Sequence, residues 1–407
     1  MYQYRGLRSG VSEGNFFGEH RSYEQRVSRR HIKGLNANTM FSQLRISICL
    51  LWIVVLCHFS CKKETVFIDI TGELINPRTY IIPRADQSLV IDGREEDPSW
   101  KKAPFTEDFI DIEGDKIPNQ KTRLKMLWDE DFLYIFAHLE EKHIWATLKK
   151  RDTIIFYNND FEVFISPSNS NHNYGEIEIN ALNTVWDLLL NRPYNTKGKP
   201  LFYWNLPDLK SAVHVEGTLN NPKDIDQYWS VEMAIPMRAL SELKGSPGGQ
   251  PKIGEQWRIN FSRVQWEHDL IDNRYYRKKE NGKFLRENNW VWSPQGVINM
   301  HLPEHWGYIE FSESTNVDQT WVHKTDAETE QIIYALFRKI AYGEYQHLRD
   351  DPPGKMTSIQ LVGMKDRALQ INMINSFTGF DLEVVDQLSG STYTIDESGY
   401  LNRPENQ

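Results

Sequence analysis

From Leu89 to Phe311 the sequence consists of short runs in which apolar and polar side chains alternate, and turn residues separate these runs. Successive side chains of a β-strand point to opposite faces, so this alternation is typical of strands with one buried face. Many such strands joined by turns indicate an antiparallel sandwich. We therefore predict a mainly β fold, an antiparallel, jelly-roll-like β-sandwich at residues 85–312. The expected strands are 123–128, 132–139, 161–166, 175–180, 185–190, 211–217, 228–235, 257–265 and 308–311.

A different pattern follows Thr320. Thr325 and Glu328 have the spacing of a capping box, and apolar residues then recur at helical spacing until Gly343. This predicts an amphipathic helix. Four short strands are expected after it, at 358–361, 368–374, 380–385 and 392–395. Residues 320–407 are thus predicted to form a small α+β appendage, separate enough that a chain ending near Ser312 would still fold.

The three cysteines of the chain, Cys49, Cys57 and Cys61, all lie near its N-terminus. The 346 residues after Cys61 therefore contain no disulfide and no thiolate metal site. The apolar run 46–57 is short for a membrane-spanning helix and suits the central part of a secretion signal. Cys61 follows Ser60 and resembles the lipid-modified cysteine of bacterial lipoproteins.

These features predict how the N-terminal region is processed. Residues 1–39 are expected to be a misassigned extension, residues 40–61 a lipoprotein signal peptide and residues 62–84 a tether that contains one strand. The alternatives are a short cytoplasmic tail for the first segment, and an ordinary cleaved signal or an uncleaved anchor for the second. The protein is expected to be exported and lipid-anchored to the outer membrane or cell surface.

The net charge of −9 is unevenly distributed. Residues 1–45 contain eight basic and three acidic side chains, so the rest of the chain carries −14. Nucleic acids and anionic polysaccharides select for clustered basic side chains, and an acidic body disfavours both. A neutral sugar is compatible with this charge.

Two predicted strands present polar side chains on a single face. In 161–166, Glu162 lies on the same face as Phe164, and in 175–180 the side chains of Glu176, Glu178 and Asn180 share a face. Carboxylates accept hydrogen bonds from hydroxyl groups strongly, so these residues suit sugar recognition. An ordinary solvated face is the alternative.

Arg263 shares a face with the apolar residues of strand 257–265. A buried arginine requires an acidic partner, because an unpaired buried charge is strongly unfavourable. Glu162, Glu176 or Glu178 could be this partner. Arg263 would then either support the binding site or form a purely structural salt bridge.

Several segments of the predicted sandwich resemble carbohydrate-binding modules of family 9. The first is Ile91-Asp92-Gly93 followed by Asp97-Pro98-Ser99-Trp100. The others are the stretches 127–134 (LWDEDFLY), 159–165 (NDFEVFI), 174–180 (YGEIEIN), 229–236 (WSVEMAIP) and 257–264 (WRINFSRV), together with the Trp292-Ser293-Pro294 and Trp306-Gly307 motifs.

The resemblance implies a site in which two aromatic rings hold a terminal sugar and polar side chains surround it. Phe156 and Tyr157 stand at the first aromatic position, and Trp290 and Trp292 at the second. Glu178 replaces a basic residue that the family pattern has, which puts specificity for a reducing end in doubt. The implied function is binding of a neutral poly- or oligosaccharide in support of glycan degradation or uptake, without catalysis.

Asp129, Glu130 and Asp131 cluster at a predicted turn, and relatives of this family often bind calcium through such oxygens. Because Ca²⁺ takes six to eight oxygen ligands, a simple polar turn is the alternative.

The sequence leaves two other functions open. Similar sandwiches bind haem through Met and His, for which Met126, His138, Met300 and His301 are available. A glycoside hydrolase could use Glu162, Glu176 or Glu178 as a carboxylate pair.

Overall fold

The computed structural model describes residues 64–245, 249–313, 321–364 and 367–404. Met40, the apolar run 46–57 and Cys61 lie outside the described residues. None of the helices in the described ranges combines the length and the apolar character that crossing a membrane requires.

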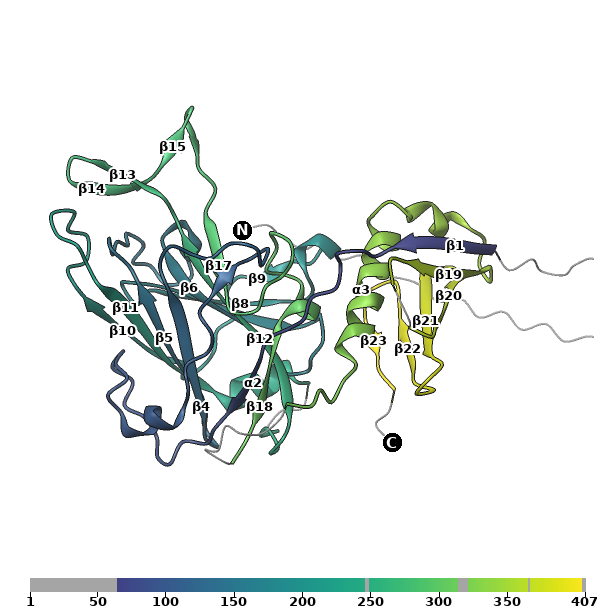
Figure 1. Cartoon of the computed structure of the whole chain (residues 1–407), viewed down its shortest axis with the longest axis horizontal. Helices are drawn as coiled ribbons and strands as arrows, with labels where there is room; N and C mark the ends of the chain where they lie inside the picture. Colours follow the sequence, from purple (N-terminus) through teal and green to yellow (C-terminus); the bar gives the residue numbers. More distant parts are fainter. Residues whose placement is uncertain (1–63, 246–248, 314–320, 365–366, 405–407) are drawn as a thin grey trace, which may run out of the picture. The chain divides into compact units, whose positions relative to one another are not determined.

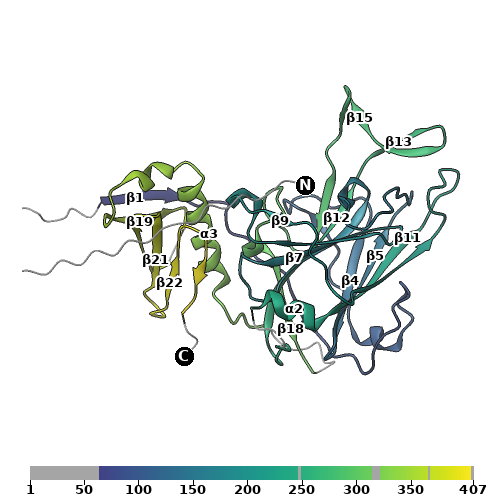
Figure 2. The same cartoon turned by 180° about the vertical axis from the view of Figure 1, so that it is seen from behind.

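Two sheets form the predicted β-sandwich (Figures 1 and 2). The larger sheet has nine strands: β2 (Thr79–Ile82), β18 (Gly307–Phe311), β12 (Gln256–Gln265), β6 (Asp160–Ser166), β7 (Tyr174–Asn180), β8 (Val185–Leu190), β9 (Pro200–Leu201), and, beside β12, β17 (Asn288–Val291) and β3 (Ile110–Asp111). The smaller sheet has four strands, in the order β10 (Lys210–Glu216), β11 (Tyr228–Pro236), β5 (Phe132–Glu140) and β4 (Thr122–Trp128).

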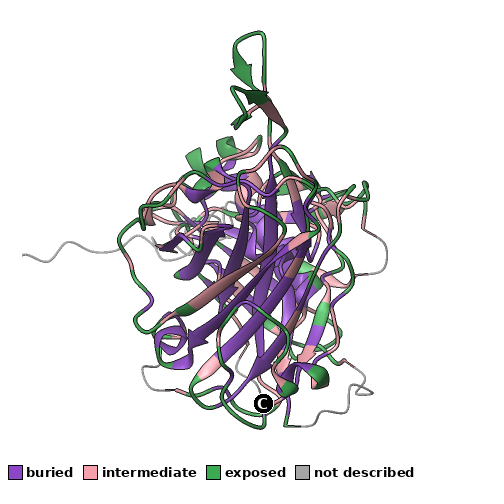
Figure 3. Ribbon diagram, turned by 90° about the vertical axis from the view of Figure 1, so that its left-hand side faces the viewer, coloured by how far each residue is buried: buried purple, intermediate pink, exposed green. Residues whose placement is uncertain are grey.

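Short elements complete the sandwich. Two hairpins follow β12 and extend outward (Figure 1), where Figure 3 shows them as largely exposed. They are β13 (His268–Ile271) with β14 (Arg274–Arg277), and β15 (Lys279–Glu280) with β16 (Lys283–Phe284). The helices here are α2 (Met237–Leu243) and the 3-10 turns η1 (Pro98–Lys102), η2 (Ile155–Tyr157), η3 (Tyr194–Thr196) and η4 (Pro303–His305).

The main core lies between the two sheets. Alternate residues of the facing strands, among them Leu124, Ile135, Val163, Ile177 and Phe261, are fully buried in it. The alternation in the sequence therefore identifies the core face correctly.

A second, smaller core covers part of the other face of the nine-stranded sheet. Phe164, Trp186 and Leu188 contribute to it from the strands, and Met300 and Trp306 from the loops above. Because this core covers the outward face as well, every residue of β6 and β7 is buried.

Residues 64–84 are part of both folded regions, which differs from the predicted tether. The strand expected there is β1 (Glu64–Asp69), and it pairs in parallel with β19 of the C-terminal sheet. β2 pairs in parallel with β18 of the sandwich. The partners lie more than 200 residues away in the sequence, so local composition alone suggested a linker.

The C-terminal region has the predicted α+β composition. Its six-stranded sheet runs β1, β19 (Met356–Val362), β20 (Leu369–Asn375), β21 (Phe380–Asp386), β22 (Thr392–Ile395) and β23 (Leu401–Asn402). The helix α3 (Ala327–Ala341) packs its apolar face into the core of this region, and η5 (Gln346–Asp350) follows it. The helix is capped by Asp326, whose Oδ1 accepts a hydrogen bond from the Thr329 N–H at 3.0 Å, and not by the predicted Thr325.

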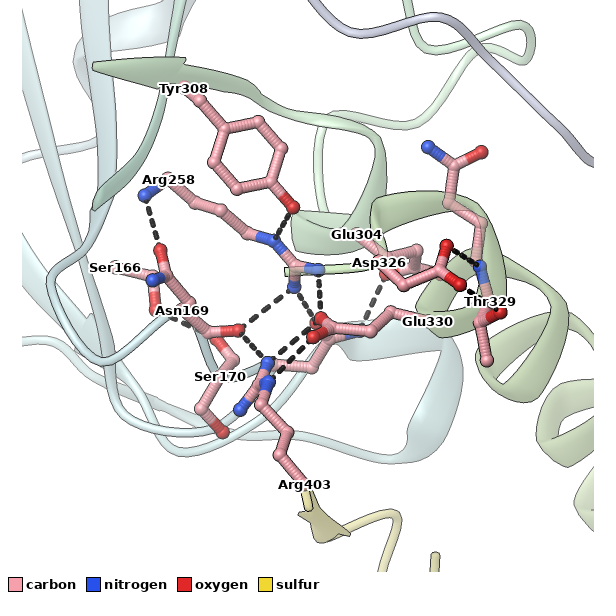
Figure 4. A network of polar contacts seen from close by, with 12 residues as sticks. Ser166, Asn169, Ser170, Arg258, Glu304, Tyr308, Asp326, Thr329, Glu330 and Arg403 are labelled. Carbon is pink, nitrogen blue, oxygen red and sulfur yellow. Dashed lines mark hydrogen bonds and ion pairs between the residues drawn. The ribbon is translucent and has the colours of Figure 1, made fainter. Parts of the chain in front are cut away.

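A buried group of ions connects α3 to the sandwich (Figure 4). Glu330 of α3 is paired with Arg258 of β12 and with Arg403, whose Nε lies 2.6 Å from Glu330 Oε1. Burial by itself raises the pKa of Glu330, but the two arginines more than offset this effect and lower it. The appendage is therefore joined to the sandwich through the fully buried pair of Glu330 and Arg258, with the partly exposed Arg403 beside it.

Candidate functional site

A pocket of about 260 Å³ opens on the outward face of the nine-stranded sheet. Its polar lining includes Glu162 of β6 and Glu176 and Glu178 of β7. These are three of the residues predicted from the sequence, and the structure brings them together.

The strand register explains why the acidic side chains meet. Glu162 lies directly opposite Glu178 on β7 and directly opposite Ser262 on β12. Glu178 in turn lies opposite Trp186 on β8. Directly opposed side chains point to the same face of a sheet, so this row crosses four neighbouring strands at the pocket.

Asp160 lies two residues before Glu162 on β6, so its side chain points to the same face of the sheet and extends the acidic group. Carboxylate oxygens of Asp160, Glu162 and Glu178 lie within 4.8 Å of one another. The three side chains are 0%, 5% and 2% exposed. Neither oxygen of Asp160 makes a hydrogen bond of good geometry to the described residues, although the nearby Val264 N–H acts to lower its pKa.

Burial is the main influence on the acidity of these groups. It raises the pKa of Glu162 to about 7, with a further increase from Glu287 and an opposing effect of the Ser262 hydroxyl. Burial, followed by repulsion from neighbouring carboxylates, raises the pKa of Asp160, Glu176 and Glu178 well above the ordinary range. A cation in the pocket would favour the ionised forms.

Aromatic side chains form walls of the pocket. Phe156 comes from η2, and its backbone N–H donates to Glu178 Oε2 at 2.9 Å. Trp186 comes from β8 and stacks on Phe202, while Tyr194 from η3 is 44% exposed. The combination of flat apolar faces and carboxylate acceptors suits a ligand with an apolar ring face and several hydroxyl groups.

His301 lies in the wall beside Tyr194, with ring centroids 4.5 Å apart. Its Nδ1 is 2.9 Å from the hydroxyl of Tyr174. Burial lowers the pKa of His301 to about 3, so the imidazole is neutral near pH 7. It offers the pocket a neutral hydrogen-bonding group.

Two predicted residues lie elsewhere on this side of the sandwich. Tyr157 faces a different hollow of about 650 Å³, where Arg277 lies over its ring at 4.6 Å. Asn180 is completely buried, and its Oδ1 accepts hydrogen bonds from the N–H groups of Leu182 and Thr184. Asn180 therefore stabilises a turn.

Arg263 faces the opposite side of the sheet from the pocket. Its Nη2 is 2.9 Å from Glu141 Oε2, and neither residue is exposed by more than 3%. Of the two roles open to Arg263, the structure supports the structural salt bridge. The acidic partner is Glu141 and none of the three pocket glutamates.

Trp290 and Trp292 both belong to the core. Trp290 is 5% exposed and packs beneath the Arg263 guanidinium, 4.9 Å from the ring centroid. Trp292 is 1% exposed and packs edge-on against Phe261, although its rim borders a hollow of about 630 Å³. Neither ring offers a free face, so the second aromatic wall implied by the resemblance is not formed by these residues.

Asp129 acts within its own turn. Its Oδ1 accepts hydrogen bonds from the N–H groups of Asp131 and Phe132, and its Oδ2 accepts one from the Tyr134 hydroxyl. Glu130 is paired with Arg84. Of the two interpretations of this cluster, the geometry supports the polar turn.

The candidate haem ligands are dispersed. Met126 is buried in the core between the sheets, whereas His138 stacks on Tyr228, with ring centroids 4.3 Å apart. Met300 and His301 are adjacent in the chain and border the carboxylate pocket. The four side chains therefore do not converge on one cavity.

Residues 91–261 match the model of a family described as "Carbohydrate family 9 binding domain-like". No curated protein matches the sequence. Among solved structures, a carbohydrate-binding module of family 9 from Caldicellulosiruptor kristjanssonii in complex with cellotriose is 13% identical, with a TM-score of 0.39 over 60% of this chain and all of that one. A putative carbohydrate-binding protein from Bacteroides uniformis is 15% identical, with a TM-score of 0.42 over 58% of this chain and all of that one. These TM-scores are below 0.5, so the likeness rests on the match to the family model: residues 91–261 are similar to the carbohydrate family 9 binding domains.

Proposed function

We propose that the sandwich binds a neutral oligosaccharide, or the end of a neutral polysaccharide, in the carboxylate pocket. The observation that carries this proposal is the row of glutamates lying between aromatic side chains. Glu162 and Glu178 accept hydrogen bonds from sugar hydroxyls, and the half-exposed ring of Tyr194 contacts the apolar face of the sugar ring. The match of residues 91–261 to a carbohydrate-binding family supports the same conclusion.

The pocket limits the size of the ligand. Its volume of about 260 Å³ is slightly below the roughly 300–1,000 Å³ of pockets that enclose drug-sized ligands. It therefore encloses one end of a sugar chain and leaves the remainder outside.

The proposal includes a cellular setting. An apolar run of signal type followed by Cys61 supports export and attachment through a lipid at Cys61, on the outer membrane or cell surface. A glycan captured there would be held for degradation or uptake. Replacement of Cys61 by Ser releases the protein from the membrane fraction if this anchor is used, and membrane attachment that persists in the variant contradicts it.

A glycan array tests the ligand class. The purified protein is expected to retain neutral oligosaccharides and to discriminate against uronic acid or sulfated glycans, because the pocket is acidic. Binding confined to anionic glycans, or equal binding by a variant that lacks the pocket aromatics, contradicts the proposal.

A further inference from the structure

The acidic group of the pocket has the geometry of a cation site. One oxygen each from Asp160, Glu162 and Glu178 lies within 4.8 Å of the other two. Glu162 and Glu178 lie directly opposite each other on the paired strands β6 and β7, and Asp160 lies two positions before Glu162 on β6, so this arrangement does not depend on a mobile loop.

Asp160 supplies an independent indication of a missing partner. It is completely buried, and both of its oxygens lack a hydrogen bond of good geometry to the described residues. Buried polar atoms are almost always hydrogen-bonded or bound to an ion. Glu176 lies two residues before Glu178 on β7, and its Oε2 is likewise buried without a hydrogen-bond partner among the described residues.

The donor atoms indicate a hard divalent cation. All of them are carboxylate oxygens, which Ca²⁺ and Mg²⁺ prefer. Ca²⁺ binds oxygen at about 2.3–2.6 Å, so two oxygens on opposite sides of the ion are about 5 Å apart, and a spacing of up to 4.8 Å can be spanned. Ca²⁺ also accepts more ligands and a less regular geometry than Mg²⁺, which suits a site that fixed strand positions define.

We propose that Asp160, Glu162 and Glu178 form a calcium site at the floor of the pocket. Three carboxylates leave some of the six to eight coordination positions of Ca²⁺ unfilled. Glu162 and Glu178 line the pocket, so the free positions open into it and are filled by water or by two hydroxyls of a bound sugar. The coordination of sugar hydroxyls rests on the proposed function, whereas the metal site itself does not.

Metal binding is tested first, without any sugar. Trp186 lies directly opposite Glu178 in the sheet, so it can sensitise the luminescence of Tb³⁺, a probe for Ca²⁺ sites. The purified wild-type protein is expected to give Tb³⁺ luminescence on excitation of tryptophan, and Ca²⁺ is expected to displace the probe. Ca²⁺ should also raise the melting temperature.

Asp160→Asn preserves shape and removes one ligand charge, and we expect it to weaken Ca²⁺ binding at least tenfold. Its melting temperature in chelator should equal or exceed that of the wild type, which shows that it folds. The matched control is Asp115→Asn, because Asp111, Glu113 and Asp115 form a second, exposed acidic group. The proposal is overturned if the wild type shows no response to Ca²⁺, or if Asp115→Asn abolishes the response and Asp160→Asn does not.

Sugar binding is tested second, by titrating the best glycan from the array with Ca²⁺ present and with a chelator. We expect the chelator to weaken binding at least tenfold. An unchanged affinity overturns the coordination of sugar hydroxyls by the ion. Ca²⁺ binding without any glycan binding overturns the proposed function and leaves the metal site standing.

Discussion

The carboxylate of Glu330 on α3 is paired with the guanidinium of Arg258 on β12, and neither side chain is exposed by more than 1%. Arg258 is further held by the Tyr308 hydroxyl, 3.0 Å from its Nε, and by the Asn169 carbonyl oxygen, 2.9 Å from its Nη1. The sandwich thus contains a buried positive charge whose acidic partner comes from the C-terminal region.

Glu330→Gln should therefore destabilise the whole protein. Removing one partner of a buried ion pair typically costs about 3–5 kcal/mol, because the other charge stays buried. Denaturation by urea measures the change in the free energy of unfolding. Glu328→Gln is the control on the same helix: its side chain is 48% exposed, and we expect a change of less than about 1 kcal/mol.

The same pair bears on the expectation that a chain ending near Ser312 folds. Such a chain retains Arg258 and lacks Glu330 and Arg403. We now expect it to be markedly less stable than the full chain, and equal stability would show that the sandwich does not need the pair.

Tyr194→Ala should weaken glycan binding without harming the fold. The ring is 44% exposed and lines the pocket, so its loss removes a contact face from the ligand. A contribution of about 1.4 kcal/mol corresponds to a tenfold change in Kd, which calorimetric titration resolves. Tyr203→Ala, at a tyrosine that is 82% exposed and is not part of this pocket, serves as the control. Equal affinity of the two variants would remove Tyr194 from the site.

Trp292→Ala should act on stability. Truncation of a buried tryptophan typically costs about 3–5 kcal/mol, through lost burial and the cavity that remains. Thermal melting measures the effect, and Phe377→Ala, at a side chain that is 96% exposed, should melt like the wild type. A Trp292→Ala variant with a normal melting temperature and reduced glycan affinity would restore this residue to the binding site.

The carboxylate pocket should make stability depend on pH when divalent cations are removed. The pKa of Glu162 rises from an ordinary value of 4.5 to about 7 in the folded protein, so folding takes up a proton between these values. Stability should therefore fall as the pH rises from about 4.5 to about 7. Asp160, Glu176 and Glu178 act in the same direction, because burial raises each pKa.

Melting temperatures of the wild type and Glu162→Gln in chelator, measured across this pH range, test the effect. The slope should be smaller for Glu162→Gln, and Glu280→Gln, at an exposed hairpin position, should keep the wild-type slope. A steeper slope in Glu162→Gln would contradict the assignment.

Strand periodicity predicted the β-sandwich and part of the site. Parity placed Glu176 and Glu178 on one face of β7, and it places Asp160 on the same face of β6 as Glu162; the register between the two strands then brings the groups together. Because each strand presents its residues with a period of two, this information is local and readable from sequence.

The rest of the site depends on contacts between distant segments. The alternation of β12 indicates that Arg263 points toward the core. Its partner Glu141 lies 122 positions away in the sequence, so the pair could not be identified from local pattern. Trp186 was only part of an expected strand, and Tyr194 lies in a 3-10 turn without a periodic pattern. Trp290 and Trp292 were placed at the site by the resemblance alone, and no local pattern in the sequence indicates that both rings are buried in the core.

The pairing of β1 with β19 also determines the order in which the molecule can be completed. Glu64 lies opposite Thr357, which is 293 positions later in the chain. A strand that leaves the ribosome or a secretion channel early must therefore wait for almost all of the remaining chain before it gains its partner. Closing so large a loop is slow, and an unpaired strand can associate with other molecules in the meantime. We expect the last step of folding to be the docking of β1, at a rate that depends on how fast the C-terminal residues are delivered.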